Sequence, residues 1–342
     1  MERMDIRQRE KIDQRFAVPK VSVIIPTYNR PYLLRRALAS VAAQTFKNFE
    51  ILVVQNGEFH QSESVVEGFR RMGLPIRYLY EKKANAANAR NIGILNAKGE
   101  YIAFLDDDDE WLPSKLERQV RVFDENRELG LVACRGLWMD ESGVLIDEIP
   151  TSFFEEEITF KTFVKKECVI YSLSSVLIKR KCFDDIGLFN TKYSMGNDYE
   201  FYLRLSEKYG MRMIKEPLFR YYRHEENTTA DAQRMWTEMV AVLKSLKPSE
   251  HLEVSRDDLR ESIKNYGQHF HSLAVDAMDS MNYRKATECY LKAVECDPTI
   301  GLKISWSRFS NLFYRLLRPY LAVAYCALMS LVRVNSAHGG IH

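Results

Sequence analysis

The chain has 342 residues, 46% of them hydrophobic and 12% aromatic, which excludes a disordered chain and allows one large core and a smaller one. Its 49 basic and 47 acidic residues give a formal net charge of +2, so the overall charge predicts no nucleic-acid partner. The six cysteines are scattered without a CxxC pair, which favours reduced thiols in a cytoplasmic protein.

Residues 1–19 are predicted to be a charged extension. Their stretch "MERMDIRQREKIDQRF" alternates charge and lacks an apolar core, so we expect no signal peptide. Regular patterning begins at residue 20, where the first strand is expected.

Residues 20–105 alternate between predicted strands and predicted helices. The strands are the apolar runs in "KVSVIIP", "FEILVVQNGE", "PIRYLYE" and "EYIAFL". The helices are "RPYLLRRALASVAAQ", "HQSESVVEGFRRM" and "NAANARNIGILNA". Apolar strands alternating with helices predict an α/β fold with a mostly parallel sheet covered on both faces. The polar tails "PTYNR", "QNGE" and "DDDD" after the first, second and fourth strands should therefore converge on one crevice.

Less regular patterns extend this first domain, which we place at residues 20–230. Two further strands are expected in "LGLVACRGLWM" and "VIYSLSSVLIKRKCF". A short amphipathic helix follows in "DYEFYLRLSEKYG", ending at Gly210, and "PLFRYYRHEENTT" is a strand that turns into a polar loop.

Residues 231–342 have helical patterns nearly throughout. Residues 267–300 resemble one tetratricopeptide repeat, a unit that often binds protein partners, through Phe270, Leu273, Ala274, Ala277, Ala286, Tyr290, Ala293 and Pro298. One repeat cannot bury its own face, so helices near 233–246, 252–264 and 302–332 should complete a small bundle.

The C-terminal segment 304–333 allows two interpretations. Its uncharged run 319–332 has 14 residues, too few to span a bilayer, which needs about 20. The aromatic and leucine residues beside arginines are typical of a helix in peripheral contact with a membrane, whereas a helix packed on the repeat has the same pattern.

The run Asp106 to Asp109 directly follows the fourth strand. Two carboxylates about 4 Å apart repel by roughly 4 kcal/mol at an effective dielectric near 20, so the run needs solvent or a cation. If strand geometry continues, Asp106 and Asp108 face one side, where they could share Mg²⁺ or Mn²⁺ with a diphosphate. Alternatively, the acids begin the helix "LPSKLERQVRVF", which suits Asp109 and Glu110 better than the two earlier residues.

Four segments in order resemble the signatures of family 2 glycosyltransferases, which are inverting enzymes with the GT-A fold: "VSVIIPTYNR", "FEILVVQNGE", "ARNIGILNAKGEYIAFLDDDDEWLP" and "GLFNTKYSMGNDYEFYLRL". The resemblance covers residues 20 to about 228. It implies a Rossmann-like mixed sheet flanked by helices, followed here by a small all-α region. It also implies that Asp108 binds Mn²⁺ or Mg²⁺ and that Asp106 or Asp107 assists through the ribose or the metal waters.

The same resemblance implies a nucleotide-sugar donor bound at the ends of the first two strands. Arg90 would approach the diphosphate. Gln55 and Asn56 replace two acids that are usual in the family, yet the Asn56 amide oxygen can still accept from a uracil imide, so a UDP-sugar is favoured. The remaining pocket residues would be Pro26, Thr27, Tyr28 and Arg30.

On the acceptor side, the resemblance makes Asp198 the catalytic base, and Asn197 stands where the family often has Glu. Without the resemblance, Asp198 would be interpreted as a helix N-cap. His224 lies where several members place a histidine near the metal.

The implied activity is transfer of a sugar to a hydroxyl of a glycan or lipid-linked acceptor, in cell-surface polysaccharide or lipopolysaccharide biosynthesis. It would take place in the cytoplasm or on the inner face of the plasma membrane. The alternative is a catalytically impaired scaffold that binds partners through the repeat-like region.

Overall fold

The computed structural model describes residues 18–58, 62–83, 85–149, 157–166, 169–224, 231–246, 254–280 and 282–300. The chain divides into two compact units, Met1–Tyr266 and Gly267–His342. This division lies further along the chain than the expected boundary at residue 230.

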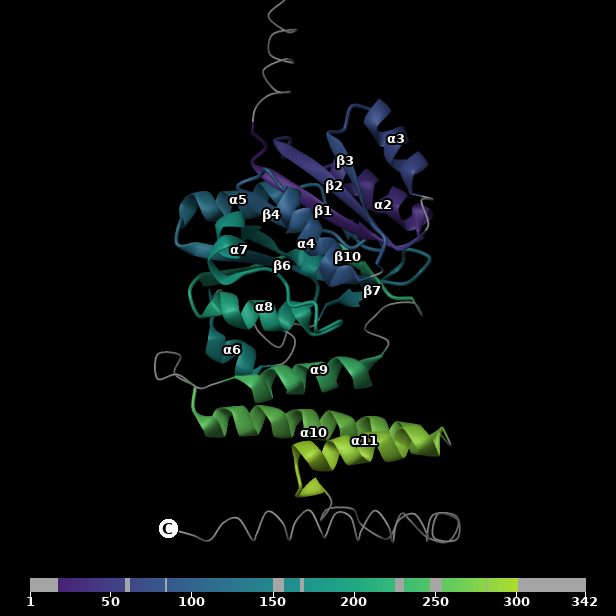
Figure 1. The fold of residues 1–342 in the computed structure, drawn as a ribbon, viewed down its shortest axis with the longest axis vertical. Coiled ribbons are helices and arrows are strands. Elements are labelled where there is room, and N and C mark those ends of the chain that lie inside the picture. The colour runs from purple at the N-terminus through teal and green to yellow at the C-terminus, as the bar shows by residue number, and fades with distance from the viewer. Residues whose placement is uncertain are drawn as a thin grey trace, which may run out of the picture. The chain divides into compact units, whose positions relative to one another are not determined.

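The first unit is built on one mixed sheet (Figure 1) with the strand order β3-β2-β1-β4-β9-β6-β10-β5. Neighbours β3, β2, β1 and β4 are parallel, and β6 is parallel to β10. β9 is antiparallel to both β4 and β6, so it joins two sets of strands that run in the same direction. The strands are β1 Val21–Thr27, β2 Phe49–Asn56, β3 Ile76–Glu81, β4 Tyr101–Phe104, β5 Glu110–Trp111, β6 Leu129–Met139, β7 Leu145–Glu148, β8 Glu157–Ile158, β9 Leu177–Lys179 and β10 Gly210–Tyr222.

Helices follow the strands as the alternating pattern predicts. In this unit they are α2 Pro31–Ala42, α3 Glu63–Arg71, α4 Ala86–Asn96, α5 Lys115–Glu125, α6 Phe160–Lys165, the 3₁₀ turn η1 Leu173–Ser175, α7 Arg180–Ile186, α8 Asn197–Ser206 and α9 Ala232–Ser245. Two local predictions were wrong. The strand expected across "VIYSLSSVLIKRKCF" is only β9, between η1 and α7, and the helix expected to end at Gly210 ends at Ser206.

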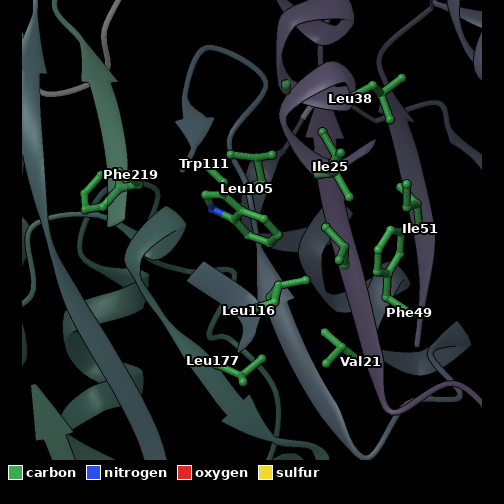
Figure 2. Close-up of a cluster of buried hydrophobic side chains, with 14 of the residues drawn as sticks. Val21, Ile25, Leu38, Phe49, Ile51, Leu105, Trp111, Leu116, Leu177 and Phe219 are labelled. Carbon is green, nitrogen blue, oxygen red and sulfur yellow. The ribbon is translucent and has the colours of Figure 1, made fainter. Parts of the chain in front are cut away.

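The two faces of the sheet are covered by different helices because successive strand residues point to opposite sides. Val21, Val23 and Ile25 of β1 share one buried core with apolar residues of α2, α3 and α5. Figure 2 shows Trp111 beside Leu105 and Leu116 in this core. On the other face, Ile24 lies against α4, where its side chain occupies the space that a Cβ at Gly93 would need.

A buried lysine and a buried glutamine of α5 connect this helix to the neighbouring strand and turn. The Lys115 ammonium donates to Gln119 Oε1 at 2.7 Å and lies 4.2 Å from the centre of the Trp111 ring. Gln119 donates to the carbonyls of Val132 and Ser175, both at 2.8 Å, and so ties α5 to β6 and to η1. Burial lowers the pKa of Lys115 from its usual 10.5 to about 8.

The second unit contains the end of α10 (Arg256–Asp279) and α11 (Tyr283–Cys296). Gly267 lies against Cys296, and the His271 ring contacts the Tyr290 ring, so the two helices run antiparallel. Small residues Ala274, Ala277, Ala286 and Ala293 are buried there. The helix expected at 252–264 is the first part of α10 and not a separate helix. Assignment as a tetratricopeptide repeat stays a prediction.

Several expectations concern residues outside the described ranges. The segment 304–333 and the charged extension are among them. Within the described residues, no helix has the length and hydropathy that crossing a membrane requires. Four of the six cysteines are described, Cys134, Cys182, Cys289 and Cys296, and each is a free thiol, as expected.

Replacing Gly93 with Ala should destabilise the sheet unit by about 1–3 kcal/mol, because the new Cβ would lie 2.4 Å from Ile24. The matched control is Gly68→Ala in α3, where a Cβ meets nothing within 4 Å. That change should stabilise by about 0.5–1 kcal/mol through helix propensity. Urea unfolding of both variants measures the difference, and equal effects would contradict the close packing of α4 on β1.

Replacing Lys115 with Met should stabilise the protein by about 2 kcal/mol at pH 7. The change removes a buried charge, and this gain exceeds the cost of leaving Gln119 Oε1 without the hydrogen bond from Lys115. Between pH 8 and 10.5 the unfolded lysine holds a proton that the folded one has lost, so wild-type stability rises relative to the variant. From pH 7 to 10.5 the urea midpoint of the wild type should therefore rise to that of the variant and then pass it. A constant difference over that range would contradict the lowered pKa.

Candidate active site

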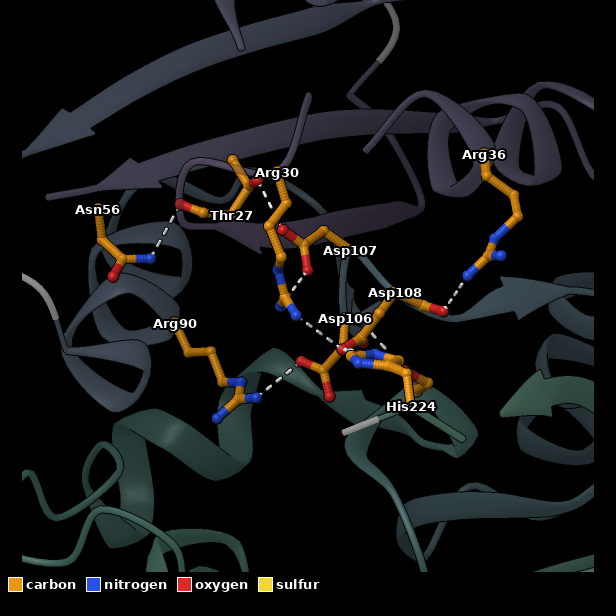
Figure 3. A network of polar contacts seen from close by, with 10 residues as sticks. Thr27, Arg30, Arg36, Asn56, Arg90, Asp106, Asp107, Asp108 and His224 are labelled. Carbon is orange, nitrogen blue, oxygen red and sulfur yellow. Dashed lines mark hydrogen bonds and ion pairs between the residues drawn. The ribbon is translucent and has the colours of Figure 1, made fainter. Parts of the chain in front are cut away.

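The polar segments after β1, β2 and β4 meet at one edge of the sheet, as predicted (Figure 3), and the end of β10 joins them there. Strand geometry stops at Phe104, and the run Asp106 to Asp109 forms a turn before β5. The expected alternation of faces along the four aspartates is therefore wrong. Each carboxylate instead has its own set of partners.

Asp107 and Asp108 share one guanidinium. Arg30 Nη2 lies 2.5 Å from Asp107 Oδ1, and Arg30 Nη1 lies 3.0 Å from Asp108 Oδ2. The Thr27 hydroxyl also donates to Asp107, at 2.7 Å. Arg30 thus supplies, from within the chain, part of the positive charge that the acidic run requires.

Asp106 binds a second arginine. Arg90 Nη2 of α4 donates to Asp106 Oδ1 at 2.7 Å, and the Asp106 backbone N–H donates to Ser174 Oγ at 3.1 Å. Charges on Asp106 and Asp198 both raise the pKa of Arg90, although its burial opposes them. Arg90 therefore lies between the acidic run and the start of α8.

Asp109 and Glu110 do not begin the following helix. That helix, α5, starts at Lys115, and Ser114 is its N-cap. Asp109 is buried and accepts from Ser172 Oγ at 3.3 Å, and burial raises its pKa well above the usual range. Glu110 lies in β5, where it pairs with Arg220 and accepts from the Tyr222 hydroxyl.

Two neighbouring carboxyl groups respond to the site in opposite directions. Burial raises the pKa of Asp107 to about 7, and Arg30 only partly offsets this effect. Burial acts on Asp108 in the same direction, but the hydrogen bond from His224 and the charge of Arg30 outweigh it, so the pKa of Asp108 is lowered.

Asp108 and His224 are the side chains best placed to hold a divalent metal. His224 Nε2 lies 3.2 Å from Asp108 Oδ2, and both side chains are largely buried. Within the described part of the chain, no three His, Cys, Asp or Glu side chains form a ready metal site. The donor set therefore fits a metal that takes one or two protein ligands and completes its shell with diphosphate oxygens and water.

The Tyr28 ring and the Asn56 amide lie at the ends of the first two strands. The Tyr28 ring, 48% exposed, lies where a Cβ at Gly57 would be, and Gly57 has φ +96°. Asn56 donates through its amide nitrogen to the Thr27 carbonyl at 3.0 Å, so its amide oxygen remains an acceptor. Pro26 is buried within β1, so only its backbone could take part in the base pocket.

Asp198 lies in the first turn of α8 and is not the N-cap, which is Gly196. It accepts from the Tyr199 backbone N–H at 2.7 Å. Burial raises its pKa, and Arg90 acts against this rise. The Tyr202 hydroxyl and the Asn197 amide oxygen are buried and have no hydrogen-bond partner among the described residues.

A carboxylate from α9 holds the loop before Asp198. Glu238 accepts from the backbone N–H groups of Met195 at 2.8 Å and Gly196 at 3.0 Å, and from Ser194 Oγ at 2.7 Å. These bonds lower the pKa of Glu238 although its burial acts against them.

Sequence reasoning missed several residues that build the site, namely Arg36, Ser172, Ser174, Tyr222 and Glu238. Their partners are far away in the sequence, and the residues belong to no motif. Only the serine-rich "SLSS" could have been noticed as a source of hydroxyl donors.

Comparison with known proteins gives a consistent result. Residues 22–187 match the model of glycosyl transferase family 2. An uncharacterised glycosyltransferase of Rickettsia typhi is 29% identical over 228 residues, which is 66% of this chain and 70% of that protein. A Campylobacter jejuni protein, GalNAc(5)-diNAcBac-PP-undecaprenol beta-1,3-glucosyltransferase, is 26% identical over 283 residues, 81% of this chain and 89% of that protein.

Solved structures share the fold at low identity. S. aureus TarS 1–349 in complex with UDP-GlcNAc superposes with a TM-score of 0.57 at 17% identity, covering 81% of this chain and 90% of that one. The mannosyltransferase PcManGT from Pyrobaculum calidifontis, in complex with GDP-Man and Mn²⁺, gives 0.54 at 16% identity, covering 83% and 87%. These likenesses concern the fold.

Proposed function

Since the chain belongs to the family 2 glycosyltransferases and has the GT-A fold, we propose that it transfers a sugar from a UDP-sugar to a hydroxyl of a lipid-linked glycan, with a divalent metal. The observation that carries this proposal is the convergence of Asp108, His224, Arg30 and Arg90 at one edge of the sheet. An anionic metal ligand beside two guanidinium groups suits a metal-bound diphosphate.

Donor binding begins with the base. The exposed face of Tyr28 can stack on a pyrimidine, and the Asn56 amide oxygen can accept from its imide. The preference for uridine draws support from the UDP-GlcNAc complex of TarS, whereas PcManGT has GDP-Man.

The diphosphate would be held by the metal and by the two arginines Arg30 and Arg90. Asp108 and His224 would hold Mn²⁺ or Mg²⁺, with Asp106 or Asp107 assisting through the ribose or water. The metal would supply positive charge to the departing diphosphate. Arg30 must exchange part of its contact with Asp108 for phosphate oxygens, since guanidinium groups bind both anions well.

Asp198 would act as the base that removes the proton from the acceptor hydroxyl. The partial burial of Asp198 raises its pKa, which strengthens a carboxylate as a base. A direct attack of the hydroxyl on the anomeric carbon inverts its configuration.

The acceptor class draws on the C. jejuni relative, whose name specifies a glycan linked through diphosphate to undecaprenol. Such an acceptor places the reaction on the inner face of the plasma membrane, in cell-surface polysaccharide biosynthesis. The alternative of an inactive scaffold rests on Gln55, Asn56 and Asn197, but the acidic residues of the site are intact.

Thermal shift with UDP, GDP, dTDP, CDP and ADP, each with and without Mn²⁺, tests the donor side. UDP with Mn²⁺ should raise the melting temperature more than UDP or Mn²⁺ alone, because a ligand that binds only the folded state stabilises it. No shift with any nucleotide in folded protein would favour the scaffold.

Two variants separate binding from transfer. Asp108→Asn should remove the Mn²⁺-dependent part of UDP binding, since the amide is a weaker metal ligand. Asp198→Asn should keep that binding and lower transfer or donor hydrolysis at least 100-fold, through loss of the base. Calorimetry and UDP-release assays report the two effects, and metal-dependent binding that survives in Asp108→Asn would remove Asp108 from the metal site.

The ring over Gly57 gives a sharper test of the base pocket. Gly57→Ala should weaken UDP binding about tenfold by displacing Tyr28, an effect comparable to one stacking contact. Gly73→Ala is the matched control, because Gly73 also has positive φ, +93°, but has open space around its Cβ. Both variants should lose similar stability, about 1–3 kcal/mol, and equal UDP affinity in the two would contradict the stacking role.

A further inference from the structure

Arg36 of α2 reaches the acidic run from the side opposite Arg30 (Figure 3). Its Nη2 donates to the backbone carbonyl of Asp108 at 2.5 Å. Arg30, in contrast, binds the Asp108 carboxylate itself. Arg36 can therefore fix the position of Asp108 while leaving both carboxylate oxygens for other partners.

The same guanidinium stacks on the end of β10. Arg36 Cζ lies 3.5 Å from the centre of the Tyr222 ring, which is the spacing of a close cation–π contact. Tyr222 is buried, and its hydroxyl donates to Glu110 Oε2 at 2.7 Å. His224 follows two residues later, so Arg36 links the backbone of Asp108 to the strand that delivers His224.

This double contact needs an arginine. A planar guanidinium can stack with its face and donate with its edge at the same time, whereas an ammonium cannot do both as well. Arg36 Nε is buried without a hydrogen-bond partner among the described residues, so ordinary solvation does not explain the placement of the side chain. Its neighbour Arg35 is exposed.

We propose that Arg36 is a positioning residue that sets Asp108 and His224 at the separation needed to take up a divalent metal together with a nucleotide diphosphate. This inference rests on the proposed function and extends it to a residue of α2. Replacing a residue that orients a metal ligand through a hydrogen bond typically weakens metal affinity by about 10- to 100-fold.

The test measures Mn²⁺ affinity directly, by the EPR signal of free Mn²⁺, with UDP at a fixed saturating concentration. Arg36→Met should weaken Mn²⁺ binding at least tenfold and change UDP affinity without metal less than twofold. Arg36→Lys should recover part of the loss, because it can still donate to the Asp108 carbonyl. Arg35→Met is the matched control and should bind as wild type.

Tyr222 provides a second route if Arg36→Met does not fold. Tyr222→Phe keeps the ring and should stay within twofold of wild type, whereas Tyr222→Leu removes it and should weaken Mn²⁺ binding at least fivefold. Wild-type Mn²⁺ affinity in Arg36→Met, or in Tyr222→Leu if Arg36→Met does not fold, would overturn this inference and leave the proposed function standing. Failure of the wild type to bind Mn²⁺ with any nucleotide diphosphate would overturn the proposed function and the inference with it.

Discussion

The pairing of Arg30 with Asp107 and Asp108 is the interaction on which the rest of the site depends. Consecutive buried carboxylates repel one another and lose hydration, and a buried charge is tolerated only with a well-placed partner. Arg30 contacts both carboxylates, Thr27 donates to one, and His224 lies on the other. These contacts allow the turn after β4 to keep its carboxylates largely buried at the carboxyl ends of the strands.

Much of this arrangement could be predicted from the sequence because it follows from local patterns. Apolar strands separated by helices predicted the parallel part of the sheet, and parallel strands bring their carboxyl ends together. Thr27, Asn56 and Asp107 therefore meet although they come from the ends of three different strands. The order of the motifs also led to the family whose model residues 22–187 match.

The rest depends on contacts that no local pattern contains. The strand ends at Phe104, so the period of two does not apply to the aspartates that follow. Arg36 and Ser174 reach that turn from positions about 70 residues away on either side. Likewise, the continuity of α10 through residue 267 could not be inferred from repeat spacing, since both a break and a continuous helix fit that pattern.

Glu238 also affects how far the catalytic module extends. It belongs to α9, beyond the last strand and beyond the segment that matches the family model, yet its carboxylate takes up the free N–H groups just ahead of Asp198. A chimera that joins this sheet to the helical tail of a relative would preserve the geometry around Asp198 only if the junction followed Ser245. The exchangeable tail therefore starts no earlier than the end of α9, and Glu238 of that helix is constrained by its contacts with the loop before Asp198.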